Sequence, residues 1–312
     1  MLISVVVPVY NEGPRIVHNL ERILAAAESD EYEIELLAVD DGSADSSSAE
    51  VQRLALTDPR VRLLSFTRNF GKEAAVLAGL EHSRGEAAVV LDSDLQHPPS
   101  LIPKMVALWQ AGSPVVEAVK RKRNDPSRLD GLFARGFYSL YRRLSGFDIE
   151  GHSDFKLLDR QVIDIYLALP ERYRFFRGLV NWLGMESEVL HFDVDPRDGA
   201  SRWSKFSLLR YALNNVTAFS TIPLVIVTWL GCLTLGFGVL MVAVTLLQKL
   251  TGHAAAGFTT VNILLILIGG SIMTSLGIIG HYVGKIYFEI KSRPIYVCKP
   301  AKRSAKCNSP RL

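Results

Sequence analysis

The chain has 312 residues, of which 48% are hydrophobic and 21% are charged, and this mixture suits a soluble part joined to a membrane part better than either alone. The formal net charge is +3, and the three cysteines lie at positions 232, 298 and 307, which excludes a disulfide framework in the first two hundred residues. The N-terminus has neither a basic segment nor a small-residue cleavage site. No secretory signal peptide is therefore predicted, and we expect the large domain to stay in the cytoplasm.

The first 120 residues alternate short β-branched runs with amphipathic stretches. Strands are predicted over residues 3–9, 34–39, 61–66, 87–91 and 115–119, and helices over residues 15–27, 46–56, 72–81 and 99–110. The near-continuous Val, Ile and Leu content of the strands predicts an α/β fold with a mostly parallel sheet covered on both faces. In such folds ligands bind at the carboxyl ends of strands. Two acidic clusters fall at such ends, Asp40-Asp41 and Asp92-Ser93-Asp94.

Two later segments precede the membrane part. Residues 121–146 interleave Arg and Lys with Phe and Tyr, a pattern that fits either core packing or a surface in contact with lipid or a lipid-like substrate. Residues 205–219 place apolar side chains at helical spacing directly before a long apolar run. This spacing predicts an amphipathic helix that lies in the membrane interface.

Two stretches, Tyr211–Gln248 and Ala254–Gly280, contain no Asp, Glu, Lys or Arg, and each exceeds the roughly 20 apolar residues that cross a bilayer core. They predict a hairpin of two transmembrane helices, at residues 222–248 and 258–283. From Lys285 onward, eight basic residues stand against one acid, Glu289, for a net charge of +7. Because positively charged segments stay in the cytoplasm, the large domain and the tail are both predicted there.

The acidic motif Asp92-Ser93-Asp94 is the sharpest chemical feature of the sequence. Two carboxylates two residues apart, directly after a buried strand, can meet one hard cation such as Mg²⁺ or Mn²⁺. The earlier cluster Asp40-Asp41 has two interpretations, which are a cap for the following helix and an acceptor for hydrogen bonds from a base or ribose. The motif Asn69-Phe70-Gly71-Lys72 opens a helix, where free N–H groups and Lys72 are expected to face a phosphate.

Four motifs, in this order, carry a resemblance to a known family: Val7-Pro8-Val9-Tyr10-Asn11-Glu12, Val39-Asp40-Asp41-Gly42-Ser43, Arg68-Asn69-Phe70-Gly71-Lys72 and Asp92-Ser93-Asp94-Leu95-Gln96-His97-Pro98-Pro99. They resemble family 2 glycosyltransferases of the GT-A fold. With the two apolar stretches, the chain resembles the bacterial polyprenyl-phosphate (bactoprenol) glucosyltransferases of the O-antigen-modification type, which are relatives of dolichol-phosphate mannose synthase. Processive synthases of this superfamily carry Gln-x-x-Arg-Trp, whereas here Gly199 precedes Arg202-Trp203, which counts against a polymerising enzyme.

The resemblance implies roles for individual residues. It implies that the donor is bound by Pro8, Tyr10, Glu12, Asp41, Lys72 and Ser93, and that the sugar diphosphate and metal are contacted by Asp92, Asp94 and Gln96. It places Asp154 near the reacting centre. It also implies that phosphates are contacted by Arg174, Arg177, Ser201 and Lys205. It also implies a layout. Residues 1–200 would form a GT-A catalytic domain, residues 201–221 the interfacial helix region, and residues 284–312 a basic cytoplasmic tail beyond the hairpin.

The implied function is metal-dependent, inverting transfer of a single sugar to undecaprenyl (polyprenyl) phosphate at the cytoplasmic face of the bacterial inner membrane. Glucose from UDP-glucose is the first candidate donor, and Mg²⁺ or Mn²⁺ would offset the charge of the departing nucleoside diphosphate. Because a phosphate acceptor is already ionised, we expect Asp154 to orient it or to help a residual proton leave. Arg174, Arg177 and Lys205 would offset the charges of the two facing anions.

Two alternatives stay open at this stage. One is the same chemistry with mannose, galactose, N-acetylhexosamine or aminoarabinose, and the other is a non-catalytic membrane scaffold that binds nucleotide sugars. The expected partners are the nucleotide-sugar donor, the lipid acceptor and membrane lipids, and no nucleic acid is expected. A second copy of the chain, a separate flippase and a downstream transferase are further candidate partners.

Overall fold

The computed structural model describes residues 1–120, 152–192, 222–251 and 258–300. These residues belong to two compact units. The first contains the described residues up to 192 together with 293–300, and the second contains residues 222–251 and 258–292. Two predicted features, the basic and aromatic segment 121–146 and the amphipathic helix 205–219, lie outside the described residues.

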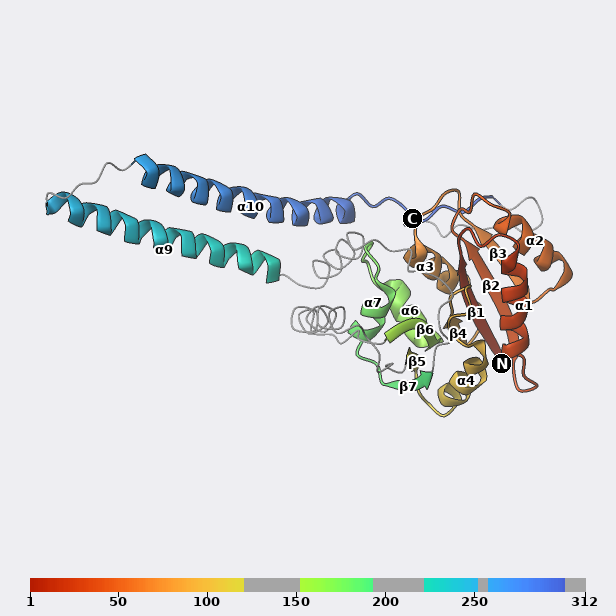
Figure 1. The fold of residues 1–312 in the computed structure, drawn as a ribbon. Coiled ribbons are helices and arrows are strands. Elements are labelled where there is room, and N and C mark those ends of the chain that lie inside the picture. Colours follow the sequence, from red (N-terminus) through yellow and green to blue (C-terminus); the bar gives the residue numbers. More distant parts are fainter. Residues whose placement is uncertain (121–151, 193–221, 252–257, 301–312) are drawn as a thin grey trace. The chain divides into compact units, whose positions relative to one another are not determined.

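The first unit is built on a seven-stranded sheet with the order β3-β2-β1-β4-β6-β5-β7 (Figure 1). The strands are β1 (Leu2–Val9), β2 (Glu33–Asp40), β3 (Val61–Ser65), β4 (Ala87–Val90), β5 (Val115–Lys120), β6 (His152–Asp159) and β7 (Ser187–Phe192). β1 pairs in parallel with β2 and β4, β2 with β3, and β5 with β7. β6 runs antiparallel to both of its neighbours, β4 and β5. The predicted mostly parallel α/β sheet is confirmed, with β6 as the reversed strand among those described.

Helices cover both faces of this sheet. They are α1 (Arg15–Ala27), α2 (Ser47–Thr57), α3 (Lys72–His82), the 3-10 turn η1 (Pro99–Leu101), α4 (Ile102–Gln110), α6 (Arg160–Ala168) and α7 (Phe176–Trp182). On one face, Val5 of β1 belongs to the same core as Ile16 of α1. On the other face, Val39 of β2 packs with Ala75 of α3. Successive side chains of a strand point to opposite faces, which is why strands buried on both sides are apolar throughout.

Each element predicted within the first 120 residues is present, with bounds that differ by one residue at most, except that the helix predicted over residues 99–110 begins as η1 before it continues as α4. The parallel strands β1, β2 and β4 all end at the same edge of the sheet. The two acidic clusters follow β2 and β4 and are therefore brought to that edge.

The second unit consists of α9 (Ile222–Leu250) and α10 (Phe258–Ile290), which pack against each other. Within the described residues, one helical stretch, Leu267–Ile290, is long and apolar enough to cross a membrane by length and composition, and Val227–Met241 is a shorter apolar stretch. The two-helix transmembrane hairpin therefore stays a prediction. α10 continues to Ile290, beyond the end predicted at residue 283, so the basic segment begins within the helix.

After α10 the chain contributes a short segment to the first unit. Cys298 forms an antiparallel bridge with Phe66, directly after β3. The N–H of Thr67 donates to the carbonyl oxygen of Val297 at 2.9 Å, and the N–H of Lys299 donates to that of Ser65 at 2.7 Å. The region expected to be one basic tail from residue 284 is thus divided between the end of a helix and a segment docked on the sheet.

Candidate active site

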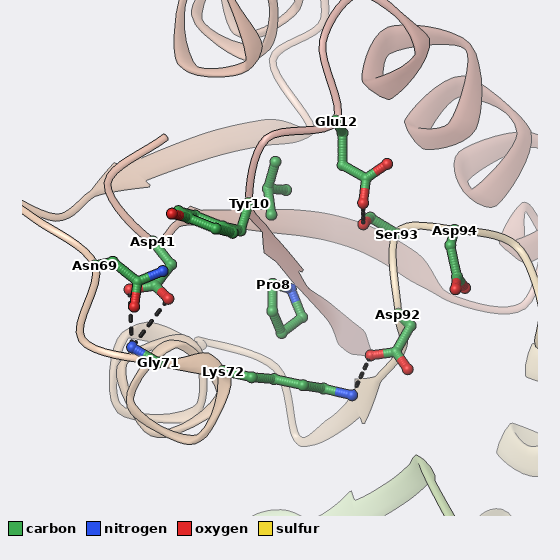
Figure 2. A pocket seen from close by; sticks show the side chains of 11 residues that line it. Pro8, Tyr10, Glu12, Asp41, Asn69, Gly71, Lys72, Asp92, Ser93 and Asp94 are labelled. Carbon is green, nitrogen blue, oxygen red and sulfur yellow. Dashed lines mark hydrogen bonds and ion pairs between the residues drawn. The ribbon is translucent and has the colours of Figure 1, made fainter. Parts of the chain in front are cut away.

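A cavity of about 340 Å³ opens at the carboxyl ends of β1, β2 and β4 (Figure 2). It is lined by Pro8, Val9, Tyr10, Glu12, Asp41, Asn69, Gly71, Lys72, Asp92, Ser93 and Asp94. Of the nine residues predicted for the donor site and the acidic motif, eight are in this set, and Gln96 is the exception. The eight come from four separate segments of the chain.

Asp41 is held in place by backbone donors. Its carboxylate, which is 3% exposed, accepts the N–H of Phe70 at 2.6 Å and that of Gly71 at 2.9 Å. Burial raises the pKa of Asp41, and the two N–H donors only partly offset this effect. Asp41 therefore supports the turn that leads into α3, and not the helix that follows β2. The N–H groups of Phe70 and Gly71 are both used by Asp41, and the expected contact of this helix start with a phosphate stays a prediction.

The residues after β1 are fixed by the start of α2. The N–H groups of Glu12 and Gly13 both donate to the hydroxyl of Ser47, at 2.9 Å each. The hydroxyl of Ser93 donates to the Glu12 carboxylate at 3.3 Å, which joins this loop to the acidic motif. Tyr10 keeps 48% of its surface exposed at the cavity, so its ring is available to a ligand.

The acidic motif follows β4 and turns sharply. Leu95 has a positive φ of 57°, and the N–H of Gln96 donates to the carboxylate of Asp94 at 3.1 Å. Asp94 and Asp92 both line the cavity, whereas Gln96 is outside the lining set. Asp92 lies 2.5 Å from the ammonium group of Lys72. His97 packs against Phe155 and Phe192, with ring centroids 5.8 and 5.6 Å apart.

Lys72 links the acidic motif to Asp154 on β6. Its ammonium nitrogen lies 2.6 Å from Oδ2 of Asp154, and Arg177 of α7 binds the same carboxylate through Nε at 2.5 Å and Nη2 at 3.0 Å. Burial alone would raise the pKa of Asp154, but the Arg177 hydrogen bonds and the Lys72 charge outweigh it and hold that pKa well below its usual range. Partial desolvation lowers the pKa of Lys72, whose side chain is 40% exposed, but the facing Asp154 and Asp92 carboxylates outweigh this and raise it.

Glu73, the next residue of α3, was not singled out from the sequence. Its carboxylate accepts the N–H of Phe176 at 2.9 Å. Burial, together with the nearby charge of Asp154, raises the pKa of Glu73 to about 7. The sequence analysis also missed an ion pair between Lys156 of β6 and Glu117 of β5. The two side chains face each other across the paired strands and are 0% and 3% exposed.

The structure separates the predicted phosphate contacts into three groups. Arg177 joins the cluster around Asp154. Arg174 is 7% exposed and donates to the carbonyl oxygens of Tyr166 and Leu169, so it holds the end of α6 and is not brought to the cavity. Ser201 and Lys205 lie outside the described residues.

Comparison with known proteins points to one family. Residues 4–164 match Glycosyl transferase family 2. The chain is 36% identical over 306 residues to the SfII prophage-derived bactoprenol glucosyl transferase of Shigella flexneri, an alignment that covers 97% of this chain and 99% of the relative. It is also 36% identical to the prophage bactoprenol glucosyl transferase homolog of Escherichia coli (strain K12), over 97% and 100% of the two chains.

A solved structure with a similar arrangement is glucosyl-3-phosphoglycerate synthase from Mycobacterium tuberculosis in complex with uridine diphosphate. It is 19% identical, with a TM-score of 0.47, over 70% of this chain and 79% of that chain.

Proposed function

Because the chain belongs to glycosyl transferase family 2, and is thus a glycosyltransferase, we propose that it transfers one glucose from UDP-glucose to a polyprenyl phosphate, with inversion at the anomeric carbon. The names of the relatives, which are similar along nearly the whole chain, support this choice of sugar and acceptor. The observation that carries the proposal is that the cavity lined by the donor-site residues is also lined by Lys72, whose ammonium group pairs with Asp154, the carboxylate that Arg177 also binds.

The donor would bind with its nucleoside at the Asp41 end of the cavity. Tyr10 offers an exposed ring for stacking, and Asp41 offers a buried carboxylate fixed by two backbone N–H groups. A ligand group that donates hydrogen bonds to such a preorganised acceptor gains affinity without a cost for ordering it. The sugar diphosphate would then extend toward Asp92 and Asp94.

The residues at the acidic motif fit a divalent metal of the Mg²⁺ or Mn²⁺ type. Asp92 and Asp94 supply hard oxygen donors on the cavity wall, and within the described residues no group of three or more His, Cys, Asp or Glu offers a complete metal cage. A metal held by one or two carboxylates takes its remaining ligands from substrate phosphates and water. When bound, it would offset the negative charge of the departing nucleoside diphosphate.

The acceptor phosphate would meet the cluster around Asp154. A phosphate monoester has a second pKa of about 6, so it attacks without a strong base and needs charge compensation instead. The depressed pKa of Asp154 makes this carboxylate a poor base at neutral pH. We assign Asp154 the task of holding Lys72 and Arg177 in place, so that two cations face the two anionic substrates.

Chain connectivity supports the proposed membrane arrangement. The chain leaves the first unit before α9 and returns to it after α10, which favours an even number of membrane crossings between them. α9 and α10 both expose large apolar side chains, Trp229 at 72% and Met273 at 70%, which suits contact with lipid. The catalytic unit and the docked segment would then share the cytoplasmic side, with flipping and onward transfer of the product left to other proteins.

Incubating membranes that contain the protein with radiolabelled UDP-glucose, UDP-galactose, UDP-N-acetylglucosamine or GDP-mannose, with and without added polyprenyl phosphate, tests this function. We expect label in the lipid fraction from UDP-glucose, increased by polyprenyl phosphate and abolished by Asp94→Asn. The matched control is Asp164→Asn, which changes an exposed carboxylate on α6. Label from another donor would replace the sugar, and label from none would overturn the proposal in favour of a binding protein without transfer.

A further inference from the structure

The segment that follows α10 docks on the edge of the sheet nearest the donor end of the cavity. β3 is the outermost strand on this side, and residues 295–299, called here the C-terminal strap, lie along it. Two backbone hydrogen bonds, which together form the antiparallel β-bridge between Cys298 and Phe66, fix the strap. An edge strand offers unpaired N–H and C=O groups, and the strap occupies those at the end of β3.

A row of aromatic rings runs inward from the strap. Tyr296 stacks on Phe66, with ring centroids 5.0 Å apart and an interplanar angle of 18°. Phe66, which is 0% exposed, meets Phe70 edge to face at 5.7 Å. The hydroxyl of Tyr296 also donates to the carboxylate of Glu81 on α3. Tyr296 is therefore an integral part of the packing beneath the turn that leads into α3.

This turn is part of the donor end of the cavity. The N–H of Phe70 donates to Asp41 at 2.6 Å, and the guanidinium of Arg68 lies 4.6 Å from the centre of the Phe70 ring. Gly42, next to Asp41, has a positive φ of 67° and approaches so closely that a Cβ atom there would lie 2.3 Å from the carbonyl carbon of Arg68. The loop after β2, which contains Asp41 and Gly42, is thus in close contact with the turn at residues 68–71. A shift of Phe70 is therefore expected to move Asp41.

We propose that the C-terminal strap positions the 68–71 turn, and through it Asp41, for donor binding, with Tyr296 as the positioning residue. This inference rests on the proposed function, because it assigns Asp41 to the donor. The strap follows α10 directly in the chain, so its docking makes the donor site depend on the segment that leaves the helix. The enzyme would bind its donor well only when this segment is seated on β3.

Steady-state kinetics of Tyr296→Ala in the full chain tests the positioning role. We expect the KM for UDP-glucose to rise about fivefold to tenfold, while kcat and the KM for polyprenyl phosphate change less than twofold, since stacked aromatic pairs contribute on the order of such factors. Tyr296→Phe keeps the ring and should stay within twofold of wild type. Val297→Ala is the matched control, because its side chain is 45% exposed and its backbone carbonyl is retained.

A second measurement uses the intact strap and does not depend on a destabilising variant. With Cys232 and Cys307 replaced by serine, Cys298 is the remaining thiol, and its alkylation by a maleimide reports release of the strap. Since coupling between two sites is reciprocal, saturating UDP-glucose should slow this alkylation by about fivefold, whereas glucose 1-phosphate should not.

The outcomes separate the two proposals. A wild-type enzyme that transfers glucose normally, together with an unchanged donor KM in Tyr296→Ala or an alkylation rate that UDP-glucose does not alter, overturns the strap proposal alone. A wild-type chain that transfers no sugar from any donor overturns the proposed function. If another nucleotide sugar proves to be the donor, the same two measurements apply with that donor.

Discussion

The two ends of the cavity are held by different kinds of interaction. At the donor end, Asp41 is fixed by the backbone N–H groups of Phe70 and Gly71. At the other end, side-chain ion pairs join Lys72 to Asp92 and Asp154, and Asp154 to Arg177. Backbone donors are immobile once the sheet and α3 have formed, whereas charged side chains can exchange partners when an anion arrives.

This difference suggests that the two ends affect different kinetic parameters. The donor end is ready before a ligand binds, so changes there should alter affinity for the donor. At the charged end, Lys72 is ion-paired with both Asp92 and Asp154, and it can turn to phosphate oxygens when a substrate enters. Changes there should alter turnover, because in the proposed reaction charge develops at that end.

The largest effect is expected at Asp154. Asp154→Asn removes the charge that holds Lys72 and Arg177, and kcat should fall by about a thousandfold, as for other losses of a preorganised charge. Single-turnover transfer from UDP-glucose to polyprenyl phosphate measures this, with Asp164→Asn as the control. A kcat within threefold of wild type would remove Asp154 from the site and with it the division between the two ends.

Lys72→Met should have the next largest effect, a fall in kcat of about a hundredfold with a small change in the donor KM. The substitution keeps a side chain of similar length but leaves Asp92 and Asp154 without the cation that they share. Lys72→Arg should recover part of the loss, since it restores the charge. If Lys72→Met raised the donor KM tenfold and spared kcat, Lys72 would belong with the donor end.

The sequence predicted the carboxylates that follow parallel strands better than it predicted the surroundings of Asp154. Asp41, Asp92 and Asp94 follow strands with strong β-branched patterns, and parallel strands bring their carboxyl ends together whatever the rest of the fold does. The position of Asp154 depends instead on β6, which enters the sheet in reverse between β4 and β5. That pairing joins residues from distant parts of the chain, and no local pattern predicts it.

Two charged residues show why the remaining features could not be predicted. Lys156 alternates with Phe155 and Leu157 along β6, so it reads as a solvent-facing position, yet it is fully buried because the register places Glu117 opposite it. Glu73 looks like an ordinary first-turn residue of α3, and its raised pKa comes from burial by residues distant in sequence. Burial of this kind is a property of tertiary packing, which spacing along the chain does not encode.

At the donor end, Asp41→Asn should raise the KM for UDP-glucose by about tenfold while kcat changes less than threefold. The amide keeps one acceptor oxygen for Phe70 and Gly71 but loses the charge and places an NH₂ group beside an N–H donor. Isothermal titration with UDP measures the affinity without turnover, and Asp30→Asn changes an exposed carboxylate as the control. An equal loss in kcat would mean that the two ends do not act separately.

The smallest effect is a pH dependence of stability that arises at Glu73, between the two ends. Its pKa is raised from an ordinary value of 4.5 to about 7, so the folded state binds more protons than the unfolded state between these pH values. The resulting stabilisation is complete below about pH 4.5 and is lost as the pH rises through 7. Glu73→Gln, which still accepts the N–H of Phe176, lacks this titration.

The unfolding temperatures of wild type and Glu73→Gln should therefore be close at pH 5 and diverge by pH 8, with the glutamine variant the more stable at the higher pH. Glu21→Gln, at an exposed position of α1, tests whether the effect is specific, because the pKa of Glu73 is set by burial next to Asp154. A constant difference at all pH values would mean that Glu73 titrates alike in both states. Lys72 and Arg177 would then compensate the charge of Asp154 completely, so that it has no effect on Glu73. The charged end would in that case depend less on its surroundings than the donor end does.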